Sequence, residues 1–165
     1  MFKSGTDVAS NAGRRYVIHN TALQGTQSGV SFGLGAGQAL SGQGCSEALT
    51  NTVSRNNILQ VWKSNWESIQ QTSCGFGNDV NYDLFNGPVV AEPGAEANGI
   101  NGVAVYLSGN GFASMAGGQY QLAPGTAGYG KGVSIPNFND GIAAPDMGAN
   151  QSGKPAMKFG VNGTR

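Results

Sequence analysis

The sequence predicts an all-β domain built as a parallel β-helix, in which short strands stack in successive coils. The chain is rich in glycine, with 28 of its 165 residues, and only 11% of its residues are Asp, Glu, Lys or Arg. Short β-branched and aliphatic segments alternate with Asn-rich corners, most densely between residues 50 and 86. Gly and Asn tolerate the left-handed backbone angles of tight corners, and stacked coils bury aliphatic rows between them.

The composition indicates one folded domain over residues 1–165, because 39% of the residues are hydrophobic and the net charge is zero. Nine basic residues are balanced by nine acidic ones, so we expect no nucleic-acid partner. There is no apolar run of 18 residues to cross a membrane and no apolar stretch near the N-terminus to act as a signal peptide. Within the domain we expect a polar N-terminal segment at 1–13, a Gly-rich loop at 24–44 and an irregular C-terminal tail at 140–165.

Strands are expected at 16–18, 50–53, 57–62, 78–86, 103–107 and 119–122, with later extended segments at 132–138 and 156–159. His19 follows the first of these and is expected at a coil corner. The alternative for the central stretch is a helix, since Ile58, Trp62, Trp66 and Ile69 would share one helical face. The pair Asn56-Asn57 favours strands there, and a helical turn near 64–70 stays open.

Two segments, YVIHNT at 16–21 and NTVSRNNI at 51–58, resemble coils of the right-handed parallel β-helix proteins. That superfamily includes pectate lyases, alginate lyases and other polysaccharide-active proteins. YQLAPG at 120–125 and APDMGA at 144–149 resemble the C-terminal ending of its bacterial members. The resemblance implies a right-handed β-helix of about four or five coils, a polysaccharide or oligosaccharide partner, and a secreted or periplasmic location.

Members of that family usually have eight or more coils, so this chain would correspond to the C-terminal portion of such a helix. Its N-terminal coil would then be uncapped, exposing strand edges and apolar rows. We expect that end to be covered by the Gly-rich loop or by a second copy of the chain, which would make the protein a homo-oligomer.

The first hypothesis is a polysaccharide-active β-helix protein, a lyase or glycoside hydrolase acting on a plant or algal glycan. Whether the protein is an enzyme stays open, because β-helices host lyases, hydrolases, epimerases and binding modules. Glycoside hydrolysis needs a pair of carboxyl groups, and a polysaccharide lyase needs a base beside a cation that neutralises the substrate. The candidate catalytic residues, expected on one lateral face, are Lys63, Glu67, Asp79 and Asp83; Glu47 and Arg55 are further candidates. For each, an ordinary surface charge is the alternative.

A non-catalytic carbohydrate-binding module is the second hypothesis. Trp62, Trp66 and Tyr82 could form a flat aromatic platform for sugar rings, or they could pack in the core instead. The third hypothesis is a structural, self-associating cap of a larger β-helix.

Asp79, Asn81 and Asp83 would share one face of a strand and could bind Ca²⁺ through hard oxygen ligands. The EF-hand pattern fails because Leu84 stands where that loop needs Gly, and a solvated polar face is the alternative. No other cofactor is expected, and two cysteines with one histidine do not suggest a zinc site. Cys45 and Cys74 could pair or both be free.

Overall fold

The computed structural model describes residues 2–3, 13–23, 40–41, 49–61, 65–71, 74–107 and 120–155. This part of the chain contains short strands and no helix. The strands are β1 (Phe2–Lys3), β2 (Arg15–Ile18), β3 (Thr21–Leu23), β4 (Leu40–Ser41), β5 (Thr52–Arg55), β6 (Ile58–Gln60), β7 (Ile69–Gln70), β8 (Asp79–Val80), β9 (Leu84–Phe85), β10 (Val89–Val90) and β11 (Ile100–Asn101).

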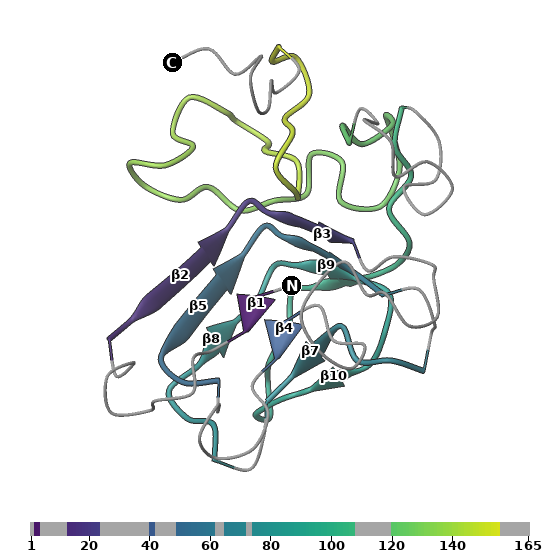
Figure 1. The fold of residues 1–165 in the computed structure, drawn as a ribbon. Coiled ribbons are helices and arrows are strands. Elements are labelled where there is room, and N and C mark those ends of the chain that lie inside the picture. Colours follow the sequence, from purple (N-terminus) through teal and green to yellow (C-terminus); the bar gives the residue numbers. More distant parts are fainter. Residues whose placement is uncertain are drawn as a thin grey trace, which may run out of the picture.

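These strands form three parallel sheets (Figure 1). Sheet A has the order β1-β4-β7-β10, sheet B the order β2-β5-β8, and sheet C the order β3-β6-β9-β11. The chain therefore visits sheets A, B and C in the same sequence three times, and each visit adds one parallel strand to every sheet. A fourth passage has β10 and β11 but no strand of sheet B, because a turn at 91–98 takes its place.

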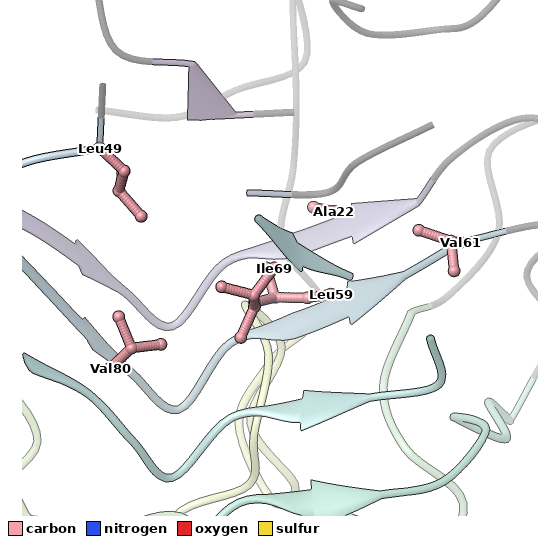
Figure 2. Close-up of a cluster of buried hydrophobic side chains, with 6 residues drawn as sticks. All are labelled: Ala22, Leu49, Leu59, Val61, Ile69 and Val80. Carbon is pink, nitrogen blue, oxygen red and sulfur yellow. The ribbon is translucent and has the colours of Figure 1, made fainter. Parts of the chain in front are cut away.

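Inward-facing aliphatic side chains from the three sheets meet in an interior cluster (Figure 2). The cluster consists of Ala22, Leu49, Leu59, Val61, Ile69 and Val80, all of them buried. The register aligns its members between passages: Ala22 pairs with Leu59 in sheet C, and Leu59 is fully buried. Each fully buried aliphatic side chain of this kind stabilises the fold by about 1.5–3 kcal/mol.

The outer face of sheet C is buried as well. Ile58 points away from Leu59, since successive strand residues face opposite sides, and both are fully buried. The cover comes from the C-terminal part of the chain, which lies beside β3 in Figure 1 and approaches Ile58 of β6 at Gly148. Together these form an outer cluster of Ile58, Leu84, Ala104, Tyr106, Leu122 and Met147. Its one buried phenol donates to Gln60 Oε1 at 3.0 Å, which satisfies the polar group of Tyr106.

Sheets B and C meet at a corner made by three residue pairs, His19–Asn20, Asn56–Asn57 and Tyr82–Asp83, which we name the B–C corner. The first member of each pair has a positive φ, of 52°, 57° and 62° in chain order. This left-handed conformation turns the chain between two strands, and Asn and His adopt it more readily than most residues. The repeated turn stacks the three corners and keeps the strands on either side in register.

The structure confirms a mainly β fold with parallel strands, and it confirms strands within 16–18, 50–53 and 57–62. The helical alternative is wrong, because Ile58 lies in β6 and Ile69 in β7 of different sheets. A single strand over 78–86 is also wrong, since the turn at Tyr82 divides it into β8 and β9.

Near the C-terminus, the expected strands at 103–107 and 119–122 are reduced to one antiparallel bridge between Tyr106 and Leu122. Residues 132–138 are described and contain no strand. The expected strand at 156–159 lies outside the described residues, as do most of the segments 1–13 and 24–44. In the described part of the chain, no helix is long and apolar enough to cross a membrane.

Candidate functional site

A ladder of buried hydrogen bonds runs along the B–C corner and includes the predicted site residue Asp83. The backbone N–H of Asn20 donates to Asn57 Oδ1 at 2.9 Å, and that of Asn57 donates to Asp83 Oδ1 at 2.7 Å. The N–H of Asp83 donates in turn to Glu96 Oε2 at 3.0 Å. Each corner amide is therefore satisfied by the side chain of the next passage, and Glu96 from the 91–98 turn ends the series.

Asp83 is fully buried, and its carboxyl group also accepts bonds from Ser54 Oγ and Asn57 Nδ2. Burial raises the pKa of Asp83 despite these donors. Burial and the neighbouring Asp83 carboxyl together raise the pKa of Glu96 to about 9. The two carboxyl groups thus keep a proton between them at neutral pH, since two adjacent charges cannot both be held in this interior.

This placement separates the residues predicted to bind Ca²⁺. Asp79 is exposed on β8 while Asp83 is inside, so the expected common face is not formed. The reason is the left-handed turn at Tyr82, which breaks the alternation of a strand. The Oδ1 of Asn81 accepts the backbone N–H groups of Tyr82 and Asn98. Within the described residues, no three His, Cys, Asp or Glu side chains are grouped to hold a metal ion.

Asp79 lines a small polar pocket of about 160 Å³, between β8 and the 91–98 turn. We name it the Asp79 pocket; its polar lining residues are Gln71, Asn78, Asp79, Asn81 and Glu92. Gln71 Nε2 donates to Glu92 Oε1 at 3.1 Å, so two of these side chains orient each other. The pocket offers the Asp79 and Glu92 carboxylates as acceptors beside polar amide side chains, a combination suited to a ligand rich in hydroxyl groups.

The outer face of sheet B continues from this pocket. Arg55 forms an ion pair with Asp79 at 2.7 Å and also donates to the Asp79 carbonyl at 2.8 Å. Tyr16 is 66% exposed and lies in the same cross-strand row as Asp79, with Val53 between them. Two strand spacings put Tyr16 and Asp79 about 10 Å apart. An exposed aromatic ring and a fixed carboxylate therefore share one surface.

The remaining predicted residues are not gathered at this surface. Glu67 is half-buried and does not line the Asp79 pocket. Trp66 is half-buried and packs against the interior cluster, whereas the half-buried Tyr82 lies at the B–C corner. Lys63 and Trp62 lie outside the described residues, as does Glu47. Three of the four candidate catalytic residues, Glu67, Asp79 and Asp83, are described. Of these three, Asp79 alone lines the Asp79 pocket.

Four residues of this surface, Tyr16, Gln71, Asn78 and Glu92, were not predicted from the sequence. The strand Tyr16–Ile18 was expected, but nothing local says that its tyrosine faces outward beside Asp79. The Pro-Gly pair that follows Glu92 is a loop signal, and it could have marked Glu92 as exposed.

Cys74 is in a disulfide bond. Cys45, the other cysteine of the sequence, lies outside the described residues. The paired form is therefore the one that the structure supports. Comparisons of the chain with protein families, with curated proteins and with solved structures find no match.

Proposed function

We propose that the protein is a parallel β-helix that binds a polysaccharide on the lateral surface formed by the Asp79 pocket and the outer face of sheet B. The β-helix is supported by the repeated order of the strands through sheets A, B and C and by parallel pairing in each sheet. A right-handed path is proposed because parallel crossover connections are almost always right-handed.

One observation supports a carbohydrate as the ligand. Carboxylates and amides line the Asp79 pocket, and Asp79 itself lies in the same cross-strand row as the exposed Tyr16. The Asp79 carboxylate can accept bonds from two sugar hydroxyls while Arg55 holds it in place. Tyr16 offers a flat apolar face to a neighbouring ring of the glycan. Few precisely placed polar groups beside an apolar surface are what a specific small-molecule site requires.

Catalysis is the companion proposal, as a glycoside hydrolase or a lyase. Hydrolysis needs a second carboxyl group, and Glu92 is the residue that shares the pocket with Asp79. A lyase would need a base, for which Lys63 and Arg55 were the candidates. Arg55 is ion-paired to Asp79, and Lys63 lies outside the described residues. Binding is therefore proposed first, and cleavage is measured in the same experiment.

The test is a panel of plant and algal polysaccharides, assayed for retention on insoluble glycan, for new reducing ends and for absorbance of unsaturated uronates. We expect one glycan to retain the protein, and Asp79→Asn or Tyr16→Ala to lose that retention. Both side chains are exposed, and a surface ion pair contributes about 0–1 kcal/mol, so the variants should fold. Asp140→Asn, an exposed carboxyl elsewhere, is the control. Cleavage lost in Glu92→Gln would add an enzyme; no retention on any glycan would refute the binding proposal.

Self-association is a second candidate function, favoured by the order of the strands. The first strands of all three sheets, β1, β2 and β3, lie at the same end, and among the described strands none pairs with their outer edges. Such edges can pair with another chain, and head-to-tail contacts of parallel stacks generate rings or filaments. Light scattering should then show a homo-oligomer, and a monomer at all concentrations would contradict this candidate.

A further inference from the structure

We propose that His19 is an acid-sensitive latch, which holds the segment 131–152 against the B–C corner while its imidazole ring is neutral. The segment covers the outer cluster on sheet C through the fully buried Met147. The latch is independent of glycan binding, because it lies at the B–C corner and involves none of the residues that line the Asp79 pocket.

The ring nitrogen Nε2 of His19 faces two amide groups whose orientation is fixed. It lies 3.1 Å from Asn56 Nδ2 and 2.9 Å from Asn139 Nδ2. Asn56 is held by both backbone groups of Val133, whose N–H donates to Asn56 Oδ1 at 2.8 Å and whose carbonyl accepts from Nδ2 at 2.7 Å. Asn56 cannot be flipped without losing both bonds, so its Nδ2 must point to the ring.

Asn139 is fixed in the same way. Its Oδ1 accepts the N–H of Ile135 at 2.6 Å, and its Nδ2 donates to the Val133 carbonyl at 3.1 Å as well as to His19. Two donors therefore converge on Nε2, which must carry a lone pair. The proton of the neutral ring is on Nδ1, where the carbonyl of Gly148 accepts it at 3.2 Å.

The rest of the surroundings is mostly neutral. The ring stacks on Phe138 with a centroid distance of 5.8 Å, and the Gln151 amide, 3.2 Å from Nδ1, donates to the same Gly148 carbonyl. The charged group that faces His19 is Asp146, on the segment itself, and its carboxylate already accepts the backbone N–H groups of Gly130 and Ser152. Burial of the ring outweighs its hydrogen bonds to the Gly148 and Asp146 backbone and the attraction of the Asp146 carboxylate, and so lowers the pKa of His19.

Protonation would put an N–H on Nε2 opposite two fixed N–H donors, so the closed arrangement loses two bonds and gains a repulsion. The sign follows from linkage. A released ring has the ordinary pKa of 6.5, and the latched ring has a lower one. As the pH falls below 6.5, the released state binds the proton first, and the equilibrium constant for release rises up to tenfold per pH unit. The rise stops once the pH is below the pKa of the latched ring.

The experiment is hydrogen exchange of residues 131–152 between about pH 7.5 and about pH 5, corrected for intrinsic exchange rates. We expect protection of this segment to fall severalfold or more in acid while the strands of sheets A and B keep theirs. His19→Gln presents a neutral acceptor and donor at every pH and should remove the acid dependence. Equal protection at both pH values in the natural protein, or the same loss in His19→Gln, would overturn the proposal.

A second measurement does not depend on the variant folding. His19 is the one histidine of the sequence, so its ring signals in an NMR titration need no assignment. We expect the neutral tautomer with the proton on Nδ1 and a titration midpoint below 6.5. A midpoint at or above 6.5, or a proton on Nε2, would refute the latch.

Discussion

The buried pair Asp83 and Glu96 makes a quantitative prediction about stability and pH. In the folded protein the pKa of Glu96 is raised to about 9, against 4.5 in an unfolded chain. Between these values the folded state holds a proton that the unfolded state releases. This contribution to stability is complete below pH 4.5 and is lost as the pH rises toward 9. One proton corresponds to about 1.4 kcal/mol per pH unit.

Glu96→Gln should remove this dependence. The glutamine oxygen can still accept the N–H of Asp83, so this bond of the corner is kept without a proton. The difference in the free energy of unfolding, variant minus natural protein, should therefore rise by roughly 3 kcal/mol from about pH 5 to about pH 7, which is two pH units at that slope. The gain is a difference between two curves, so titrations of groups away from this pair cancel.

Urea unfolding, followed by tryptophan fluorescence at several pH values, measures this difference. Glu92→Gln, which removes an exposed carboxyl from the same turn, is the matched control and should run parallel to the natural protein. If the Glu96→Gln curve is also parallel, the two carboxyl groups do not share a proton and the reasoning about the corner ladder is refuted.

Three further predictions concern stability. Leu59→Ala, at the centre of the interior cluster, should cost about 2–5 kcal/mol in urea unfolding, and a cost below about 1 kcal/mol would contradict the cluster in Figure 2. Gly148→Ala should lower the melting temperature, because φ is +93° and a Cβ would lie 2.5 Å from Ile58 Cδ1; an unchanged melting temperature would count against that close approach. Cys45→Ser should reduce stability by roughly 3–4 kcal/mol, and the intact mass of the natural chain should be about two hydrogens below its reduced form.

The sequence was sufficient to predict a mainly β fold with parallel strands where strand and corner signals agree. The runs around Val17, Val53 and Leu59 are β-branched or aliphatic; His19-Asn20 follows the first, and the pair Asn56-Asn57 follows the second. The strands expected at 50–53 and 57–62 leave a corner at 54–56, whereas the turn is at Asn56–Asn57, because Ser54 and Arg55 continue β5. A boundary error of this size reflects residues that tolerate both conformations.

The site could not be predicted in the same way. Tyr82 has little local preference for a positive φ, and its conformation is imposed by stacking beneath Asn56 at the same corner. In a strand with alternating faces, Asp83 would lie on the surface. The left-handed turn at Tyr82 places it in the interior instead. Gln71 and Glu92 are 21 residues apart, and their contact depends on how β7 and β10 pair. The role of Glu96 depends on the turn at 91–98; Glu-Pro-Gly at 92–94 signals a loop there, but nothing local shows that Glu96 turns inward to Asp83.

The most direct test of glycan binding on this lateral surface is hydrogen exchange with and without an oligosaccharide of the retained glycan. Binding as proposed would slow exchange at residues 71–81 and 91–95 and near Tyr16, and leave the segment 131–152 unchanged. Protection centred instead on Trp66 and Glu67, with residues 71–81 unaffected, would contradict the Asp79 pocket as the binding site.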